Sequence, residues 1–149
     1  MFDFSELAHI ATRILIATVL GGLLGIEREI HGHGAGLRTH MMVSMGTAMF
    51  VMSAVDMTKA TPGDLTRVIQ GIATGIGFLG AGTILKLSDR FEVRGLTTAS
   101  SIWLAAAVGT AAGLGQYRLA VVGTAIAVAV LALLRPLDQL LHRRGKGGQ

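Results

Sequence analysis

The stretch GGLLGIERE at Gly21–Glu29, followed by GLRT at Gly36–Thr39, is echoed by GIGFLGAG at Gly75–Gly82 and RGLTT at Arg94–Thr98. In each half a glycine-rich apolar segment runs into a charged loop, and the loop closes with Gly-Leu-x-Thr. The first and third apolar segments run in the same direction, so the pattern predicts a parallel repeat of two helical hairpins whose polar ends meet on one side of a bilayer. The alternative is that the two halves are alike only because their helices pack through small residues in the same way, with no functional site between them.

The composition is that of a membrane protein. The 149 residues are 51% hydrophobic and only 15% charged, with a mean hydropathy of +0.60, whereas soluble domains carry about 25% charged residues. A span of the hydrocarbon layer needs about 20 residues, so five spans take most of the chain and leave too little for a separate soluble domain. We therefore predict an all-α fold forming a single polytopic membrane domain over residues 1–149.

Five helices are expected, and no removable signal peptide. The predicted spans are residues 7–26, 39–55, 68–87, 96–113 and 119–134, followed by a short basic tail at 135–149. Nine basic residues fall on one side of these spans and four on the other. Because cytoplasmic loops carry the excess of Lys and Arg, we expect the amino terminus outside and the carboxyl terminus in the cytoplasm.

Several functions find no support in the sequence. Cysteine is absent, which excludes disulfides and thiolate chemistry. No Ser-His-Asp set, Walker loop or zinc-protease motif appears, so we expect no enzyme activity, cofactor or bound metal. The net charge of +4 is scattered over loop ends rather than forming one basic stripe, which argues against a nucleic-acid partner and fits juxtamembrane charges.

Glycines supply the expected packing surfaces. A glycine inside a helix costs roughly 1 kcal/mol relative to alanine, and in membranes close helix contact through small residues compensates for that cost. The third span has small residues on two faces, which predicts a place at the centre of the bundle. The candidate packing positions are Gly21, Gly25, Gly71, Gly75, Gly77, Gly80, Gly82 and Gly109.

The polar ends of the two hairpins hold the candidate functional cluster. Its members are Glu27, Arg28, Glu29, Arg38, Thr39, Arg94, Thr97 and Thr98. Glu27 and Glu29 are about 200° apart on a helix, so one faces inward. We favour Glu27, which continues the small-residue face of the first span and would pair with Arg38 or Arg94. The alternative is a solvated acidic helix end with Arg28 as an interfacial anchor.

The starts of the second and fourth spans could bind an anion. Free backbone N–H groups and a partial positive charge occur at helix amino termini, and arginines stand beside both starts. The ordinary alternative is that Thr39 and Thr98 cap their helices. His31, His33 and His40 are interpreted as solvated loop histidines rather than metal ligands.

Four stretches together resemble a known family. LLGIERE, AGLRTHMMVSMG, IQGIATGIGFLGAGTIL and VRGLTTASSIWLAAAVG closely resemble the hydrophobic domain of the MgtC/SapB family, in matching order from about Leu20 to Gly113. The resemblance implies a bacterial inner-membrane protein linked to magnesium limitation, acid stress or virulence. The family's best-studied members look like regulators of other membrane proteins, including the proton-translocating ATP synthase. Longer members add a cytoplasmic ACT-like domain, so this chain is similar to the short, SapB-like form.

Three functions follow as hypotheses. The first is a non-enzymatic regulator that forms a homo-oligomer, with a dimer favoured, and acts through helix contacts within the lipid bilayer. The second is a small-ion transporter or channel, for Mg²⁺ or another ion, with a site at the junction of the two hairpins. The third is a binder of acidic lipids or nucleotides at the two arginine-bearing helix starts.

Overall fold

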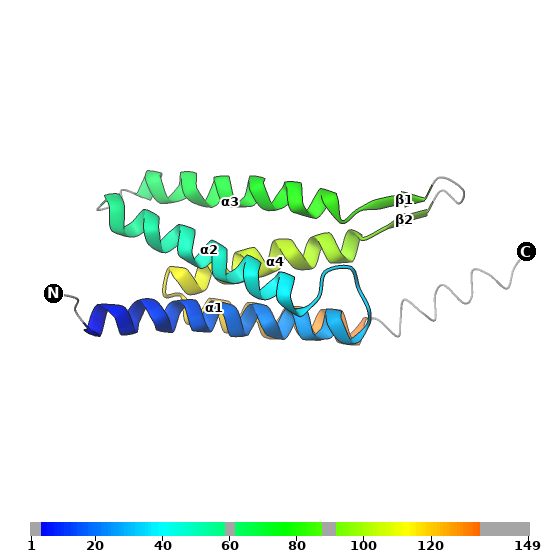
Figure 1. Ribbon diagram of the computed structural model, residues 1–149, viewed down its shortest axis with the longest axis horizontal. Helices are drawn as coiled ribbons and strands as arrows, with labels where there is room; N and C mark the ends of the chain where they lie inside the picture. Colours follow the sequence, from blue (N-terminus) through cyan, green and yellow to red (C-terminus); the bar gives the residue numbers. More distant parts are fainter. Residues whose placement is uncertain (1–3, 59–61, 88–91, 135–149) are drawn as a thin grey trace, which may run out of the picture.

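A computed structural model describes residues 4–58, 62–87 and 92–134 as a bundle of helices with one short hairpin (Figure 1). The predicted basic tail at 135–149 lies outside the described residues. The elements are α1 (Phe4–Ile30), α2 (Leu37–Thr58), α3 (Pro62–Gly82), β1 (Leu85–Leu87), β2 (Glu92–Arg94), α4 (Leu96–Gly113) and α5 (Tyr117–Leu133). Neighbouring helices along the chain run in opposite directions. The end of the bundle where α1 ends and α2 and α4 begin is called the polar end below.

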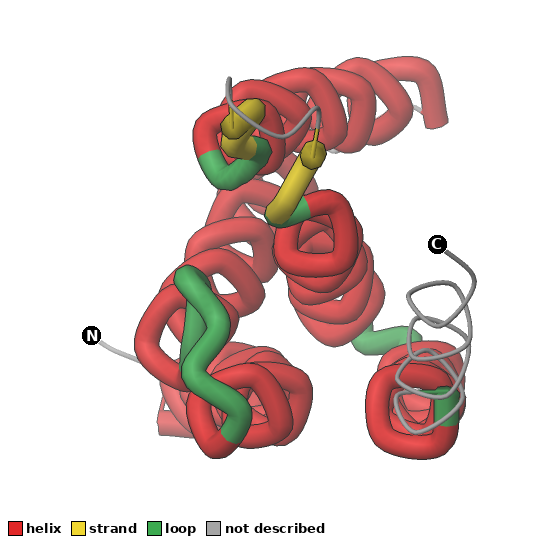
Figure 2. The backbone as a smooth tube through the Cα atoms, turned by 90° about the vertical axis from the view of Figure 1, so that its right-hand side faces the viewer, coloured by secondary structure: helices red, strands yellow, loops and turns green. Residues whose placement is uncertain are grey.

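The centre of the bundle is α4, not α3 as the two small-residue faces of the third span predicted. α4 packs against α1, α2, α3 and α5, whereas α3 packs mainly against α2 and α4. The view along the bundle in Figure 2 shows the other helices set around it. The reason lies in the sequence of α4, where small residues occupy every side of the helix. Those buried include Ala105, Ala106, Gly109, Ala111, Ala112 and Gly113.

The segment after α3 forms strands rather than continuing the helix. We predicted a helix as far as Leu87, but α3 ends at Gly82 and residues 85–87 pair with 92–94 in an antiparallel hairpin. The Thr83 hydroxyl donates to the Gly80 carbonyl at 2.8 Å, and the Thr83 and Ile84 amides close tight turns onto Gly80 and Ala81. These bonds satisfy carbonyls that a longer helix would use, and the hairpin then pairs the backbone that follows.

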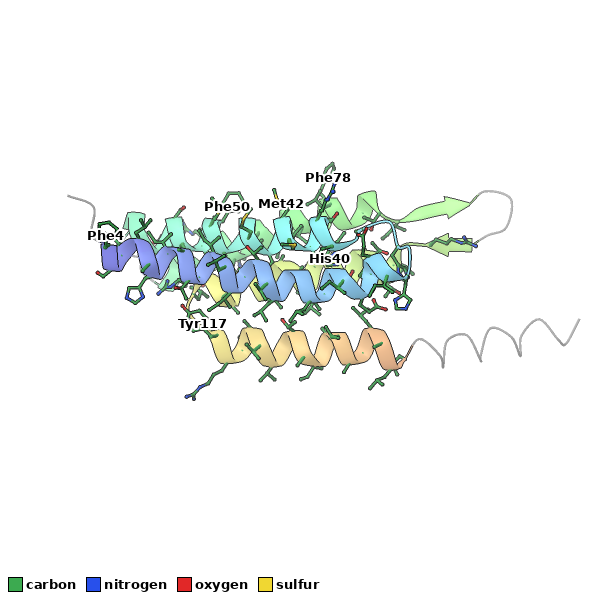
Figure 3. All side chains as sticks on the ribbon, turned by 60° about the horizontal axis from the view of Figure 1, so that its bottom comes forward. Phe4, His40, Met42, Phe50, Phe78 and Tyr117 are labelled. Atoms are coloured by element: carbon green, nitrogen blue, oxygen red, sulfur yellow. The ribbon has the colours of Figure 1, made fainter. Side chains whose placement is uncertain are left out.

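Small side chains fill the core and large apolar side chains cover the outside. The main core cluster contains Ala17, Ala48, Ala105 and Ala112, while Phe50 and Phe78 point away from the bundle (Figure 3). Phe78 is 82% exposed. Soluble proteins usually bury their large apolar residues, so this arrangement is typical of helices surrounded by lipid. By length and composition, α1 and α4 could each cross a membrane, and α5 is a shorter apolar helix.

Candidate functional site

Charged and polar side chains from three helices meet inside the polar end. Arg28 on α1 is only 3% exposed and Glu27 beside it only 8%. The Arg28 Nη2 group donates a hydrogen bond of 2.9 Å to the Thr98 hydroxyl on α4. The Nη1 group of Arg28 lies 3.8 Å from Oε2 of Glu27. The guanidinium therefore joins α1 to the first turn of α4 and partly neutralises a buried carboxylate.

Glu27 also meets the histidine one turn later on the chain. The Nδ1 atom of His31 lies 3.0 Å from Glu27 Oε1 and 2.7 Å from the Glu27 carbonyl oxygen. Oε2 is buried and accepts no hydrogen bond from the described residues. Glu27 is thus the inward carboxylate, as its place after Gly21 and Gly25 predicted. The predicted partners were wrong, because Glu27 pairs with Arg28 and His31 rather than with Arg38 or Arg94.

Glu29 has a different role at the surface. It is exposed, and its Oε2 accepts a hydrogen bond of 3.0 Å from the Leu37 amide at the start of α2. A carboxylate at this position satisfies one of the free N–H groups of the helix and complements its dipole. The side chain that caps α2 therefore comes from α1, eight residues earlier, and ties the two helices of the hairpin together.

His40 lies at the centre of the polar end and is 0% exposed. Its Nδ1 lies 2.8 Å from the Gly36 carbonyl oxygen and its Nε2 lies 3.0 Å from the Ser101 hydroxyl on α4. Ser101 in turn donates to the Thr98 carbonyl at 2.9 Å. The interpretation of His40 as a solvated loop residue was wrong. Glu27, Arg28, His40, Thr98 and Ser101 are called the buried polar cluster below.

The buried face of α2 carries the hydrogen bonding deeper into the bundle. Ser44 donates to the Ala17 carbonyl on α1 at 2.7 Å, and Thr47 donates to the Ala106 carbonyl on α4 at 3.1 Å. With His40 these residues follow the spacing i, i+4, i+7, which places them on one helix face. Sequence reasoning missed Ser44, Thr47 and Ser101, although the spacing on α2 was a signal that could have found the first two.

Other predicted members of the cluster stay outside it. Arg38, Thr39, Arg94 and Thr97 are exposed. Arg28 is not an interfacial anchor, because it is buried. Thr98 does not cap α4: the cap residue is Gly95, which has a positive φ of 96° and makes no side-chain cap hydrogen bond. The structure therefore brings Glu27, Arg28 and Thr98 together and leaves the exposed side chains of Arg38, Thr39, Arg94 and Thr97 outside the buried polar cluster.

The predicted packing glycines differ in how closely other helices approach them. An added Cβ at Gly21 or Gly25 would come within 2.6–2.7 Å of α2 atoms, and one at Gly109 would overlap the Ser44 carbonyl oxygen and the Thr47 hydroxyl. At Gly80 it would make an ordinary contact with Ala99, at 3.5 Å. Among the described residues nothing lies within 4 Å of a Cβ placed at the other four positions, all on α3, which are Gly71, Gly75, Gly77 and Gly82.

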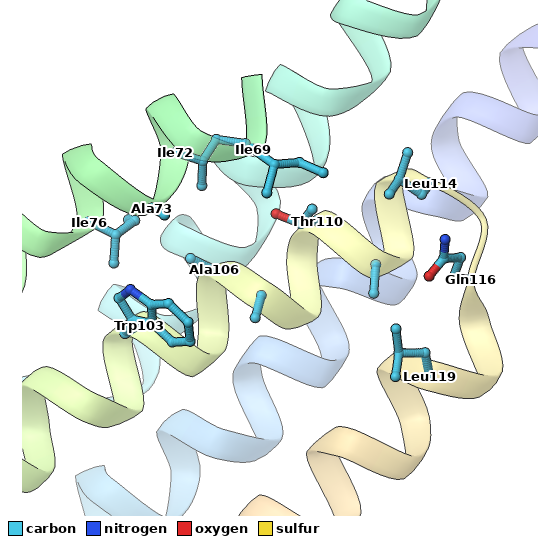
Figure 4. Close-up of a pocket in the computed structure, with 12 residues that line it drawn as sticks. Ile69, Ile72, Ala73, Ile76, Trp103, Ala106, Thr110, Leu114, Gln116 and Leu119 are labelled. Carbon is cyan, nitrogen blue, oxygen red and sulfur yellow. The ribbon is translucent and has the colours of Figure 1, made fainter. Parts of the chain in front are cut away.

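An apolar groove of about 320 Å³ opens beside α4, between α3 and α5 (Figure 4). Its lining includes Ile72, Ile76, Trp103, Thr110 and Leu119. Among the residues that the structure describes, no group of three or more His, Asp or Glu side chains is placed to hold a metal ion. The buried polar cluster thus lies between α1, α2 and α4, whereas the groove beside α4 is lined mainly by apolar side chains.

A comparison of the sequence with models of known protein families identifies the family of this chain. The model of the MgtC family matches residues 14–140, which include α1 from Ile14 onward, the remaining helices and the buried polar cluster. The chain belongs to the MgtC family. The resemblance inferred from the four sequence stretches is confirmed.

Curated relatives extend the comparison. Protein MgtC of Brucella abortus (strain 2308) is 47% identical over 147 residues, covering 95% of this chain and 60% of the relative. Protein SrpB of Synechococcus elongatus is 39% identical over 142 residues, covering 89% of this chain and 78% of the relative. Protein MgtC of Salmonella typhimurium (strain LT2) is 39% identical over 130 residues, covering 87% of this chain and 54% of the relative. The MgtC-family chain thus spans little more than half the length of the MgtC relatives. No solved structure matches it.

Proposed function

We propose that this chain is a non-enzymatic, multi-pass protein of the bacterial inner membrane that regulates other membrane proteins through helix contacts. Five spans are supported by the lengths of the helices. At 1.5 Å per residue, α2 and α3 extend about 33 and 31 Å and α5 about 26 Å, close to the hydrocarbon thickness of about 30 Å. The small-residue core and the large apolar exterior support the same placement.

The observation that carries a role in helix contacts is the outward face of α3. Gly71 and Gly75 are exposed, four residues apart, and open space lies where their side chains would be. Phe78 projects from the same side. Glycine inside a helix is less stable than alanine, and among the described residues no close contact offsets this cost at Gly71 and Gly75. A second helix packed against this face would provide such a contact, as in other small-xxx-small pairs in membranes.

The partner at this face is a second copy of the chain, related by a twofold axis along the membrane normal. In such a dimer the same face of α3 meets itself, which is the commonest symmetry of homo-oligomers. The dimer would leave the apolar groove beside α4 available to other membrane helices. The family resemblance suggests which proteins are regulated, such as the ATP synthase. It also suggests a link to magnesium limitation, acid stress or virulence.

The test is self-association of the purified full chain in lipid nanodiscs or liposomes, measured by energy transfer between labelled copies. Gly71→Leu and Gly75→Leu should abolish transfer, because the larger side chain prevents close approach. Gly123→Leu on α5 is the matched control, since its Cβ position is also open, and it should associate like the unmodified chain. An unmodified chain that shows no transfer, or leucine variants that keep it, would overturn the dimer.

A second function is favoured by one observation, the buried carboxylate of Glu27 at the junction of the hairpins. A transporter or channel for Mg²⁺ could use it as an oxygen ligand. Arg28, whose guanidinium lies 3.8 Å from that carboxylate, would repel a cation there, and this makes transport the weaker proposal. Mg²⁺ uptake into proteoliposomes that is lost in Glu27→Gln would establish transport. A folded preparation with no uptake above empty vesicles would remove it.

A further inference from the structure

The hydrogen bonds of His40 determine where its protons lie. A carbonyl oxygen can only accept a hydrogen bond, so the contact of 2.8 Å with Gly36 requires a hydrogen on Nδ1. This holds whether the ring is neutral or charged. The neutral ring is therefore the Nδ1–H tautomer, and Nε2 is the atom that gains or loses a proton.

Ser101 links that proton to the first turn of α4. Its hydroxyl has one hydrogen and lies 3.0 Å from His40 Nε2 and 2.9 Å from the Thr98 carbonyl oxygen. When His40 is neutral, both of these atoms are acceptors and compete for that hydrogen. When Nε2 is protonated it donates to Ser101, Ser101 donates to Thr98, and all the contacts form together. The two arrangements differ by one proton and by the rotation of one hydroxyl.

The ionisable groups around this junction are few. From α1, Glu27 and Arg28 face the buried polar cluster, and Arg28 acts on His40 electrostatically. The connection between α1 and α2 carries His31 and His33, and α2 itself carries the exposed Arg38. α4 holds no ionisable side chain. On α3 the ionisable residues are Asp64 and Arg67, in its first two turns at the opposite end of the bundle (Figure 1).

We propose that His40 is a proton-binding site that switches the contact between α2 and α4 at the polar end. After proton uptake, Nε2 of His40 donates a hydrogen bond to Ser101, and the Ser101 hydroxyl donates to the Thr98 carbonyl. The two hydrogen bonds form together and tighten the contact between α2 and α4. Proton loss turns the Ser101 hydroxyl toward Nε2 and releases its bond to the Thr98 carbonyl. Because the Thr98 hydroxyl accepts from Arg28, the same turn of α4 carries the change to α1.

The proton-binding site is tested by nitrogen NMR of the full chain, with labelled histidine, in nanodiscs. Titration covers about pH 8 to about pH 5, where histidine ordinarily changes charge. We expect a neutral His40 with hydrogen on Nδ1, and a shift of Nε2 to the range of a protonated nitrogen on acidification. His40→Gln should remove these signals, and His33→Gln should leave them unchanged. A neutral Nε2–H tautomer, or a ring that takes up no proton down to about pH 5, would overturn the proposal.

A second measurement tests whether protonation of His40 changes the first turn of α4. The backbone amides of Thr98 and Ile102 should shift with the same midpoint as His40, because Thr98 and its carbonyl lie at the end of the relay. Ser101→Ala should remove that shared response, and Ser101→Thr, which keeps the hydroxyl, should retain it. If Ser101→Ala does not fold, the unmodified chain and Ser101→Thr still decide the question. Amides that stay constant while His40 titrates would show that no switch exists.

Discussion

At the scale of single residues, the buried polar cluster depends on Arg28. The guanidinium and the Glu27 carboxylate share one region of the interior, together with the Thr98 hydroxyl. Removing water from two charges costs several kcal/mol, and their attraction offsets this only while both are present. Each residue is thus tolerated inside the bundle because of the other.

Substitution of Arg28 should be far more damaging than substitution of an exposed arginine. Arg28→Ala leaves the Glu27 carboxylate buried without the neighbouring guanidinium charge, which should lower the unfolding free energy by about 3–5 kcal/mol. Arg38→Ala, at the exposed second residue of α2, should change this free energy by less than about 0.5 kcal/mol. The measurement is denaturant unfolding in mixed micelles. Equal effects of the two substitutions would contradict a structural role for the buried pair.

Sequence reasoning reached Glu27 but not the partners of Glu27. A single helix face, read from Gly21 and Gly25, is enough to predict which carboxylate turns inward. Arg28 and His40 are buried because the first turn of α4 meets α1 and α2 at the polar end, and this depends on how three helices cross. Spacing within one helix contains no such information, so the sequence alone interprets His40 as a solvated loop residue and leaves Arg28 open between the functional cluster and an interfacial anchor.

At the scale of helices, the glycines show the same limit. The sequence marked Gly109 and Gly75 alike as packing positions, and both stand in small-residue surfaces. In the structure Gly109 lies against the Ser44 carbonyl and the Thr47 hydroxyl of α2, whereas Gly75 faces open space. Glycine density therefore predicted that close contacts exist, while the position of α4 at the centre of the bundle decides which glycines make them.

Alanine at these two glycines should separate their roles. Gly109→Ala places a methyl group against α2 backbone and should destabilise the folded chain by at least about 1–3 kcal/mol, the usual range for overpacking. Gly75→Ala adds a methyl group in open space, where the better helix propensity of alanine should keep stability equal or raise it by up to about 1 kcal/mol. Thermal unfolding of both variants in the same detergent gives the comparison. A neutral Gly109→Ala would place the α2–α4 contact elsewhere.

At the scale of the whole molecule, the helix order places its connections at two opposite ends. The connections from α1 to α2 and from α3 to α4 lie at the polar end, and those from α2 to α3 and from α4 to α5 lie at the other (Figure 1). In the sequence, nine of the thirteen basic residues fall within or beside the segments that join α1 to α2 and α3 to α4, or after residue 134. Hydropathy predicted the order of five helices because it acts along the chain, independently of how the helices cross, whereas the charge difference bears on the orientation of the chain in the membrane, which stays a prediction.

The charge difference predicts the orientation in the membrane, and this prediction can be tested cleanly because the chain contains no cysteine. Gly34→Cys places one thiol in the exposed connection between α1 and α2, and Gln116→Cys places one in the exposed connection before α5. In intact cells an impermeant maleimide should label Gln116→Cys, while Gly34→Cys should react only after the membrane is opened. We expect this pattern because membrane proteins usually keep the excess of Lys and Arg on the cytoplasmic side. Labelling of both thiols from outside would rule out five spans, and the reversed pattern would place the buried polar cluster and its proton site on the outer side.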